Sequence, residues 1–151
     1  MNAKEYLEQI NELRKEVAFR RQEIEALRAS MVTLSSPGFE ERLIQQDAGD
    51  APQVKLLQRI MQLEEEVKER ELLLADLKAQ AALMITCLDE RSHRIVLEQK
   101  YLINQSYGTI ANNLFVSKTT IHNWIHEAMD NLLLPENPIC IYERNERIER
   151  R

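Results

Sequence analysis

The residues best suited to chemistry lie between positions 117 and 126, on what the spacing predicts to be the outward face of a helix. Most of them are short or neutral hydrogen-bonding groups, with a single lysine among them. Such side chains suit phosphate oxygens at a helix N-terminus and base edges beyond it. The pattern therefore favours contact with double-stranded DNA through a set that comprises Ser117, Lys118, Thr119, Thr120, His122, Asn123 and His126.

The two histidines of HNWIH, four residues apart, also have the spacing of a zinc-binding helix. The position that carries the general-base glutamate in such helices is Asn123, and no third ligand is apparent. The sequence has no phosphate-binding glycine loop, dinucleotide fingerprint or nucleophile elbow. Its many carboxylates are explained by helix surfaces. We therefore predict no metal site, no cofactor and no enzymatic activity.

Three short helices are expected to position this face, within a module that spans residues 89–134. Each begins at a polar residue that can accept a hydrogen bond from the first turn. His93 is interpreted as a surface residue beside Asp89 and Glu90. The predicted caps and extents are Asp89 with about 90–103, Ser106 with about 107–114, and Ser117 with about 118–133.

Apolar spacing within the module predicts how these helices pack. Ala111 is small enough to let the second and third helices cross closely, and Val116 would fill the angle between them. Trp124 is interpreted as a core anchor. The predicted buried positions are Val96, Leu97, Tyr101, Leu102, Ile110, Leu114, Ile121, Ile125, Ala128, Met129 and Leu132.

The segment at 94–132 resembles region 4 of bacterial sigma-70-type factors; it reads RIVLEQKYLINQSYGTIANNLFVSKTTIHNWIHEAMDNL. The whole layout is similar to small phage and prophage regulators of the ArpU type. The resemblance implies a helix-turn-helix that contacts promoter DNA through residues 117–123. It also implies phosphate contacts from the start of the preceding helix, namely from Ser106, Tyr107 and Thr109.

Two features depart from that pattern. Phe115 stands in the turn where a small residue is usual, and the third helix is poor in arginine and lysine. Over residues 89–133, four cations face five carboxylates, a net charge of −1, and the whole chain carries −5. A single copy should therefore bind DNA weakly. Specific binding would need a second copy, RNA polymerase, or the basic ends of the tail at 143–151.

Two heptad seams, at 3–34 and 56–88, predict long helices joined by a mobile loop at 33–52. If the helices pair antiparallel, Arg20 falls opposite Arg70, where their charges need nearby acids. Candidate acids within a turn are Glu16, Glu23, Glu66 and Glu69. The seams allow pairing within one chain or between chains; we favour a hairpin that also dimerises.

The sequence thus predicts an all-α protein with an antiparallel coiled-coil hairpin at 1–88, the helix-turn-helix module at 89–134 and a charged tail at 135–151. Two isolated cysteines and no long apolar run favour a cytoplasmic protein without a membrane partner. The leading hypothesis is a DNA-binding transcription regulator of phage or prophage genes. The alternatives are a polymerase-binding module without DNA function and a small terminase subunit.

Overall fold

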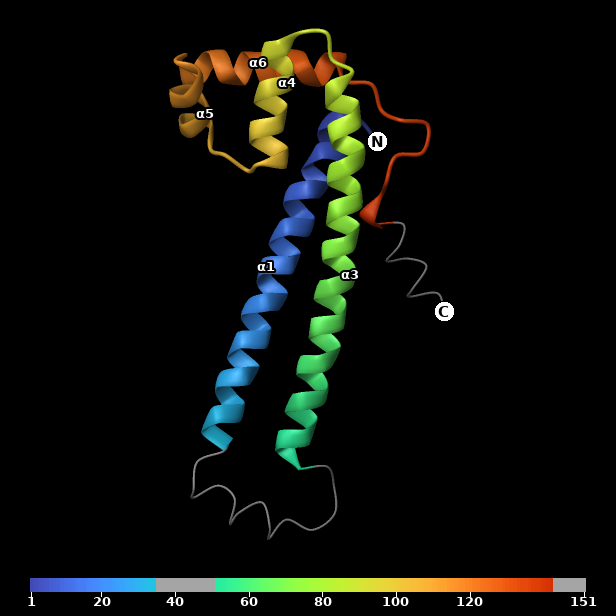
Figure 1. Cartoon of the computed structure of the whole chain (residues 1–151), viewed down its shortest axis with the longest axis vertical. Coiled ribbons are helices and arrows are strands. Elements are labelled where there is room, and N and C mark those ends of the chain that lie inside the picture. The colour runs from blue at the N-terminus through green and yellow to red at the C-terminus, as the bar shows by residue number, and fades with distance from the viewer. Residues whose placement is uncertain (35–50, 143–151) are drawn as a thin grey trace. The chain divides into compact units, whose positions relative to one another are not determined.

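The computed structural model describes residues 1–34 and 51–142, and its regular elements there are all helical (Figure 1). The all-α class is therefore confirmed for this part of the chain. Most of the predicted loop at 33–52 lies outside the described residues, as do the basic residues at 143–151. The elements are α1 (Ala3–Leu34), α3 (Pro52–Thr86), α4 (Arg91–Leu97), the π-helix η1 (Glu98–Leu102), α5 (Tyr107–Leu114) and α6 (Lys118–Asn131).

The chain forms two compact units, and the division falls inside both long helices. The first unit combines Met1–Arg14 with the chain from Leu73 onward, and the second is Lys15–Leu72. Each unit has its own cluster of buried apolar side chains. The start of α1 and the end of α3 therefore belong with the short helices.

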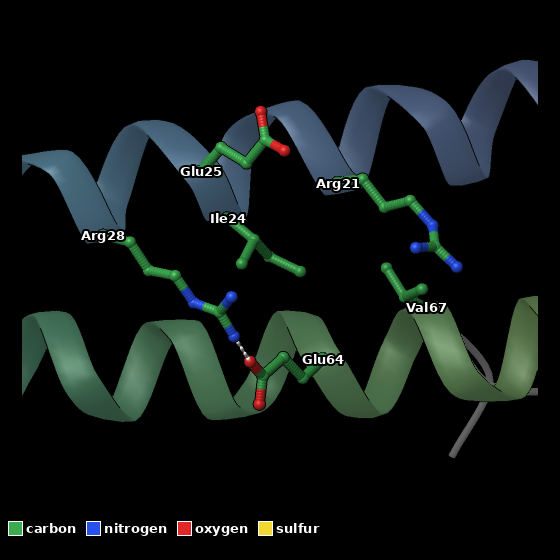
Figure 2. A pocket seen from close by; sticks show the side chains of 6 residues that line it. All are labelled: Arg21, Ile24, Glu25, Arg28, Glu64 and Val67. Carbon is green, nitrogen blue, oxygen red and sulfur yellow. Dashed lines mark hydrogen bonds and ion pairs between the residues drawn. The ribbon is translucent and has the colours of Figure 1, made fainter.

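In the second unit, α1 and α3 bury five aliphatic side chains at the predicted seam positions, with Leu27 and Met31 packed beside them. Ion pairs flank this cluster. Arg28 pairs with Glu64 across the two helices, beside a pocket that Ile24 and Val67 also line (Figure 2). The buried residues of this cluster are Val17, Ile24, Ile60, Leu63 and Val67.

Arg20 and Arg70 interrupt the seams, and each reaches a carboxylate. A nitrogen of Arg20 lies 3.4 Å from Glu23 and another lies 3.8 Å from Glu66. Arg70 pairs with Glu16 at 3.3 Å. Glu16, Glu23 and Glu66, which were predicted to neutralise the two guanidiniums, therefore pair with them.

In the first unit, the same seams continue and join the core of the short helices. Tyr6, Ile10 and Leu13 of α1 are fully buried, as are Leu77 and Ala81 of α3. At the start of α1, the side chains of Asn2 and Glu5 each accept the other residue's backbone N–H, at 2.8 and 3.0 Å. This reciprocal cap satisfies two N–H groups that helix geometry leaves without partners.

The first short helix differs from its predicted form. Its N-cap is Glu90, which makes no side-chain cap hydrogen bond, so the predicted cap at Asp89 is wrong. The backbone carbonyl of Asp89 instead accepts a hydrogen bond from Arg94. The helix also widens at Glu98, where Ile103 N–H reaches the carbonyl of Glu98, five residues back, at 3.0 Å. What the spacing predicted as one α-helix is therefore α4 followed by η1.

The interpretation of His93 as a surface residue is wrong. Only 5% of the residue is exposed, and its Nε2 lies 3.1 Å from a carboxylate oxygen of Glu127 on α6. α4 packs against α6. The α6 residue Ala128 is fully buried, and its side chain ends at Cβ, which allows a close approach. His93 thus supplies a polar contact inside the α4–α6 interface.

Candidate nucleic-acid interface

Both helices of the predicted DNA-binding pair begin with the same serine–threonine arrangement. Ser117 Oγ accepts the backbone N–H of Thr120 at 3.2 Å, and the two hydroxyl oxygens are 2.9 Å apart. At α5, Ser106 and Thr109 repeat these contacts at 3.2 and 2.8 Å. The predicted caps of α5 and α6 are therefore confirmed. Each cap leaves other N–H groups of the first turn without intrahelical partners, as every helix start does.

Phe115 forms the turn between the two helices in the left-handed conformation, with φ 57° and ψ 39°. Its backbone N–H approaches the carbonyl of Asn112 at 3.4 Å, and Val116 N–H bonds to the carbonyl of Ala111 at 3.1 Å. These bonds close α5 as an αL-type helix end, where glycine is usual because it has no Cβ. The residue is 93% exposed. The fold keeps the glycine-type turn and accepts the strain of a phenylalanine in it.

α6 has distinct buried and exposed faces. Ile121, Ile125 and Ala128 are buried against α4 and α5, and Trp124 packs at the edge of that core. The packing of Trp124 against the core agrees with its predicted role as an anchor. Of the residues predicted to face DNA, Thr120 is half-buried and the others are exposed, namely Ser117, Lys118, Thr119, His122, Asn123 and His126.

The start of α5 lies beside this exposed face. Ser106 and Thr109 are exposed, and the half-buried ring of Tyr107 stacks on His122 with centroids 4.1 Å apart. The side chain of Lys118 lies over α5, at Gly108. A Cβ placed on Gly108 would be only 3.3 Å from Cε of Lys118. The predicted residues of α5 and α6 therefore meet on one surface.

Lys100, a residue that the sequence did not assign to the site, also belongs to this surface. Its ammonium nitrogen lies 4.2 Å from the centroid of the Tyr107 ring, in cation–π geometry. The π-turn of η1 carries Lys100 and ends just before the segment that leads into α5. The sequence does not predict the widened turn, so it also does not predict that the Lys100 side chain lies beside Tyr107.

A groove of about 450 Å³ separates this surface from the first turns of α1. Lys4 and Glu8 line it on the α1 side, and His122, His126 and Asp130 line it on the α6 side. The sequence could not predict that α1 lines this groove, because more than 100 positions separate Lys4 from these α6 residues. Burial and the nearby Glu8 carboxylate raise the pKa of Tyr101, which also lines the groove, so its hydroxyl stays neutral.

Charge is distributed unevenly along α6. The single lysine, Lys118, stands at the N-terminus, where the helix dipole is also positive. The acids Glu127 and Asp130 follow in the C-terminal half, and Glu127 is engaged by His93. The end of the helix best suited to a phosphate is therefore the end that carries Ser117 and Lys118.

The metal-binding interpretation of His122 and His126 gains nothing from the structure. Among residues 1–34 and 51–142, no group of three His, Cys, Asp or Glu side chains is placed to hold a metal ion. In the same part of the chain, no helix is long and apolar enough to cross a membrane. Comparison with known protein families, with curated proteins and with solved structures finds no match to this chain.

Proposed function

We propose that this protein is a sequence-specific DNA-binding transcription regulator of the phage or prophage type, which acts through α5, the Phe115 turn and α6. The observation that carries the proposal is the exposed polar face of α6, opposite a fully apolar buried face. A helix that served only to close a three-helix core would have no need of this particular run of hydroxyl, amide and imidazole groups at its N-terminal half.

The proposed contacts divide into two kinds. Lys118 and the backbone N–H groups at the start of α6 would hold one phosphate, and Ser106, Tyr107 and Thr109 would contact another from α5. His122, Asn123 and His126 lie further along α6, where side chains of a recognition helix meet base edges in the major groove. Asn123 has the amide that pairs best with adenine.

The charge of the module implies a partner that strengthens binding. With four cations against five carboxylates at residues 89–133, few phosphates can be neutralised by one copy. We propose that a second copy supplies the missing contacts and that RNA polymerase adds to them. Under this proposal the coiled-coil hairpin of α1 and α3 contributes to oligomerisation.

Fluorescence anisotropy with a pool of random-sequence duplexes, followed by the tightest selected duplex, tests the proposal. Lys118→Glu should weaken binding about tenfold in 0.1 M salt and lower the salt dependence by about one phosphate. Lys55→Glu is the matched control, since Lys55 is an exposed lysine on α3 in the other unit and makes the same charge change. Equal binding by wild type and both variants at every salt concentration would refute the assignment of the DNA contact to α6, and lack of binding to any duplex would refute the DNA-binding role.

A second function is favoured by a different observation. Phe115 exposes 93% of its surface on a module with net charge −1, and exposed aromatic side chains are common anchors of protein interfaces. A polymerase-binding module without DNA contact would use this ring. It would retain a polymerase subunit in a pull-down, lose it on Phe115→Ala, and shift no duplex.

A further inference from the structure

The outer side of α3 in the second unit carries a line of exposed apolar side chains. Met61 and Leu72 are 61% and 62% exposed, and Val54 and Leu57 are exposed as well. Steps of three, four and eleven positions place these four residues along one line of a helix with 3.6 residues per turn. We call this line the outer row. It runs on the side of α3 opposite the residues that are buried toward α1, namely Ile60, Leu63 and Val67.

The outer side of α1 in the same unit is different. It exposes one large apolar side chain, Phe19, and the residues three and four positions to either side of it are all polar. A single exposed apolar residue is ordinary on a protein surface. Apolar residues that recur at spacings of three and four are instead the pattern by which one helix packs against another. The outer row is therefore a surface for a further helix.

Two charged residues of opposite sign interrupt the outer row. Glu65 and Lys68 occupy the helical positions between Met61 and Leu72, and both are exposed. Within residues 1–34 and 51–142, neither of them forms an ion pair, whereas three neighbouring glutamates of α3 each pair with an arginine of α1. A helix that packs on the outer row must therefore meet one negative and one positive group, with an apolar residue on either side of them.

We propose that this helix is α3 of a second copy, packed antiparallel on the outer row. About a two-fold axis between positions 66 and 67, Glu65 of each copy faces Lys68 of the other, and Met61 of each copy faces Leu72 of the other. The surface is then self-complementary, with two ion pairs at its centre and apolar contacts beyond them. The inference deepens the proposed function, which calls for a second copy, by naming the surface through which that copy joins.

Charge favours this register over its neighbours. A shift of one helical turn in one direction places Glu65 opposite Glu65, and a shift in the other direction places Lys68 opposite Lys68. A parallel pair in register does both. Like charges that face each other are destabilising, and a polar layer of this kind fixes how two helices align. The proposed register also sets the two large residues at the start of the outer row opposite small exposed residues of α3, Ala79 and Ala75.

Sedimentation equilibrium of the full-length chain without DNA tests the pairing. We expect wild type to form dimers, and Leu72→Ser to raise the dissociation constant about tenfold, because the apolar contact is lost on both sides of the two-fold axis. Phe19→Ser is the matched control, since Phe19 is 69% exposed on α1 of the same unit, and it should leave the dissociation constant unchanged. Equal weakening by the two substitutions would overturn the proposal, as would a wild-type chain that stays monomeric at its highest soluble concentration.

Charge reversal tests the register. Glu65→Lys places like charges opposite each other twice in one dimer, so it should raise the dissociation constant about tenfold, and Lys68→Glu should do the same. The chain with both Glu65→Lys and Lys68→Glu again has opposite charges across the interface and should return to within about twofold of wild type. A mixture of the two single variants should also pair more tightly than either variant pairs with itself. Such recovery shows that the single variants are folded.

A double reversal that stays as weak as the single ones would show that Glu65 and Lys68 do not face each other, which would overturn the antiparallel register. Glu65→Lys without effect would overturn it too, because in a parallel pair this change only exchanges one like-charged contact for another. Failure here is distinguishable from failure of the proposed function. A chain that stays monomeric but binds a duplex would contradict only the pairing of α3, and a chain that dimerises but binds no duplex would contradict only the DNA-binding role.

Discussion

The hydroxyl of Tyr6 donates a 2.6 Å hydrogen bond to Oε1 of Gln80, and the same oxygen accepts the N–H of Ile139. The N–H of Ile139 can only donate and the carbonyl of Asn137 can only accept, so these two backbone groups fix which end of the amide is oxygen and which is nitrogen. With Oε1 committed in this way, Nε2 is directed to the carbonyl of Asn137. A buried tyrosine of α1 thus adds a hydrogen bond to the orientation in which Gln80 of α3 holds residues 137–139.

Alkaline pH should destabilise the protein through this tyrosine. Burial raises the pKa of Tyr6 from its ordinary value of 10.0 to about 12. The folded state then holds the proton more tightly than the unfolded state, so the stabilisation is complete below pH 10 and is lost as pH rises toward 12. We expect a fall of about 2 kcal/mol across this window in urea unfolding. Tyr6→Phe should remove the part of the decline that Tyr6 causes and leave the part caused by Tyr101, whose pKa burial also raises. An unchanged slope in Tyr6→Phe would contradict this account.

The Phe115 turn should be improved by glycine. The left-handed conformation costs an L-residue about 1–2 kcal/mol, and the exposed ring gains little from packing. Phe115→Gly should therefore raise the free energy of unfolding by about 1 kcal/mol. Phe115→Ala removes the ring but keeps the Cβ, so it should leave stability close to wild type. If alanine stabilises as much as glycine, the ring and not the backbone is the source of the strain.

The contact of His93 with Glu127 should contribute to the packing of α4 against α6. Removal of the carboxylate leaves a buried imidazole nitrogen without its nearest partner, which costs about 1–2 kcal/mol. Glu127→Ala should lower the thermal midpoint accordingly. Glu90→Ala is the comparison, because its carboxylate is 3.8 Å from the same nitrogen and its side chain is 69% exposed. Equal effects of the two substitutions would show that the 3.1 Å contact has no special role.

The sequence predicts best where a local rule decides the structure. The caps of α5 and α6 follow from Ser106 and Ser117, and the buried face of α6 follows from the spacing of Ile121, Ile125 and Ala128. In each case the relevant partners are within a few positions, so propensity and periodicity are sufficient.

Features that depend on distant partners were missed. His93 reads as a surface residue because its neighbours Asp89 and Glu90 are acidic, but it is buried where α4 packs against α6 and contacts Glu127, 34 positions away. Gln9 and Gln80 read as ordinary polar residues of long helices, yet both hold a segment 57 or more positions distant. The π-turn at Glu98 has no signature in the residue pattern, so the position of Lys100 beside Tyr107 could not be predicted.

Arg20 and Arg70 should limit the stability of the second unit while they restrict how its helices pair. Their side chains are 36% and 22% exposed, and both interrupt a seam that is otherwise aliphatic. Arg20→Leu with Arg70→Leu extends the apolar contact and removes two partly buried charges, so we expect a gain of about 1 kcal/mol. The double variant should also populate more than one association state by light scattering, because a polar layer disfavours alternative registers. Arg21→Leu with Arg28→Leu makes the same charge change at more exposed positions and should do neither. A loss of stability in the first pair would show that their ion pairs outweigh the added apolar contact.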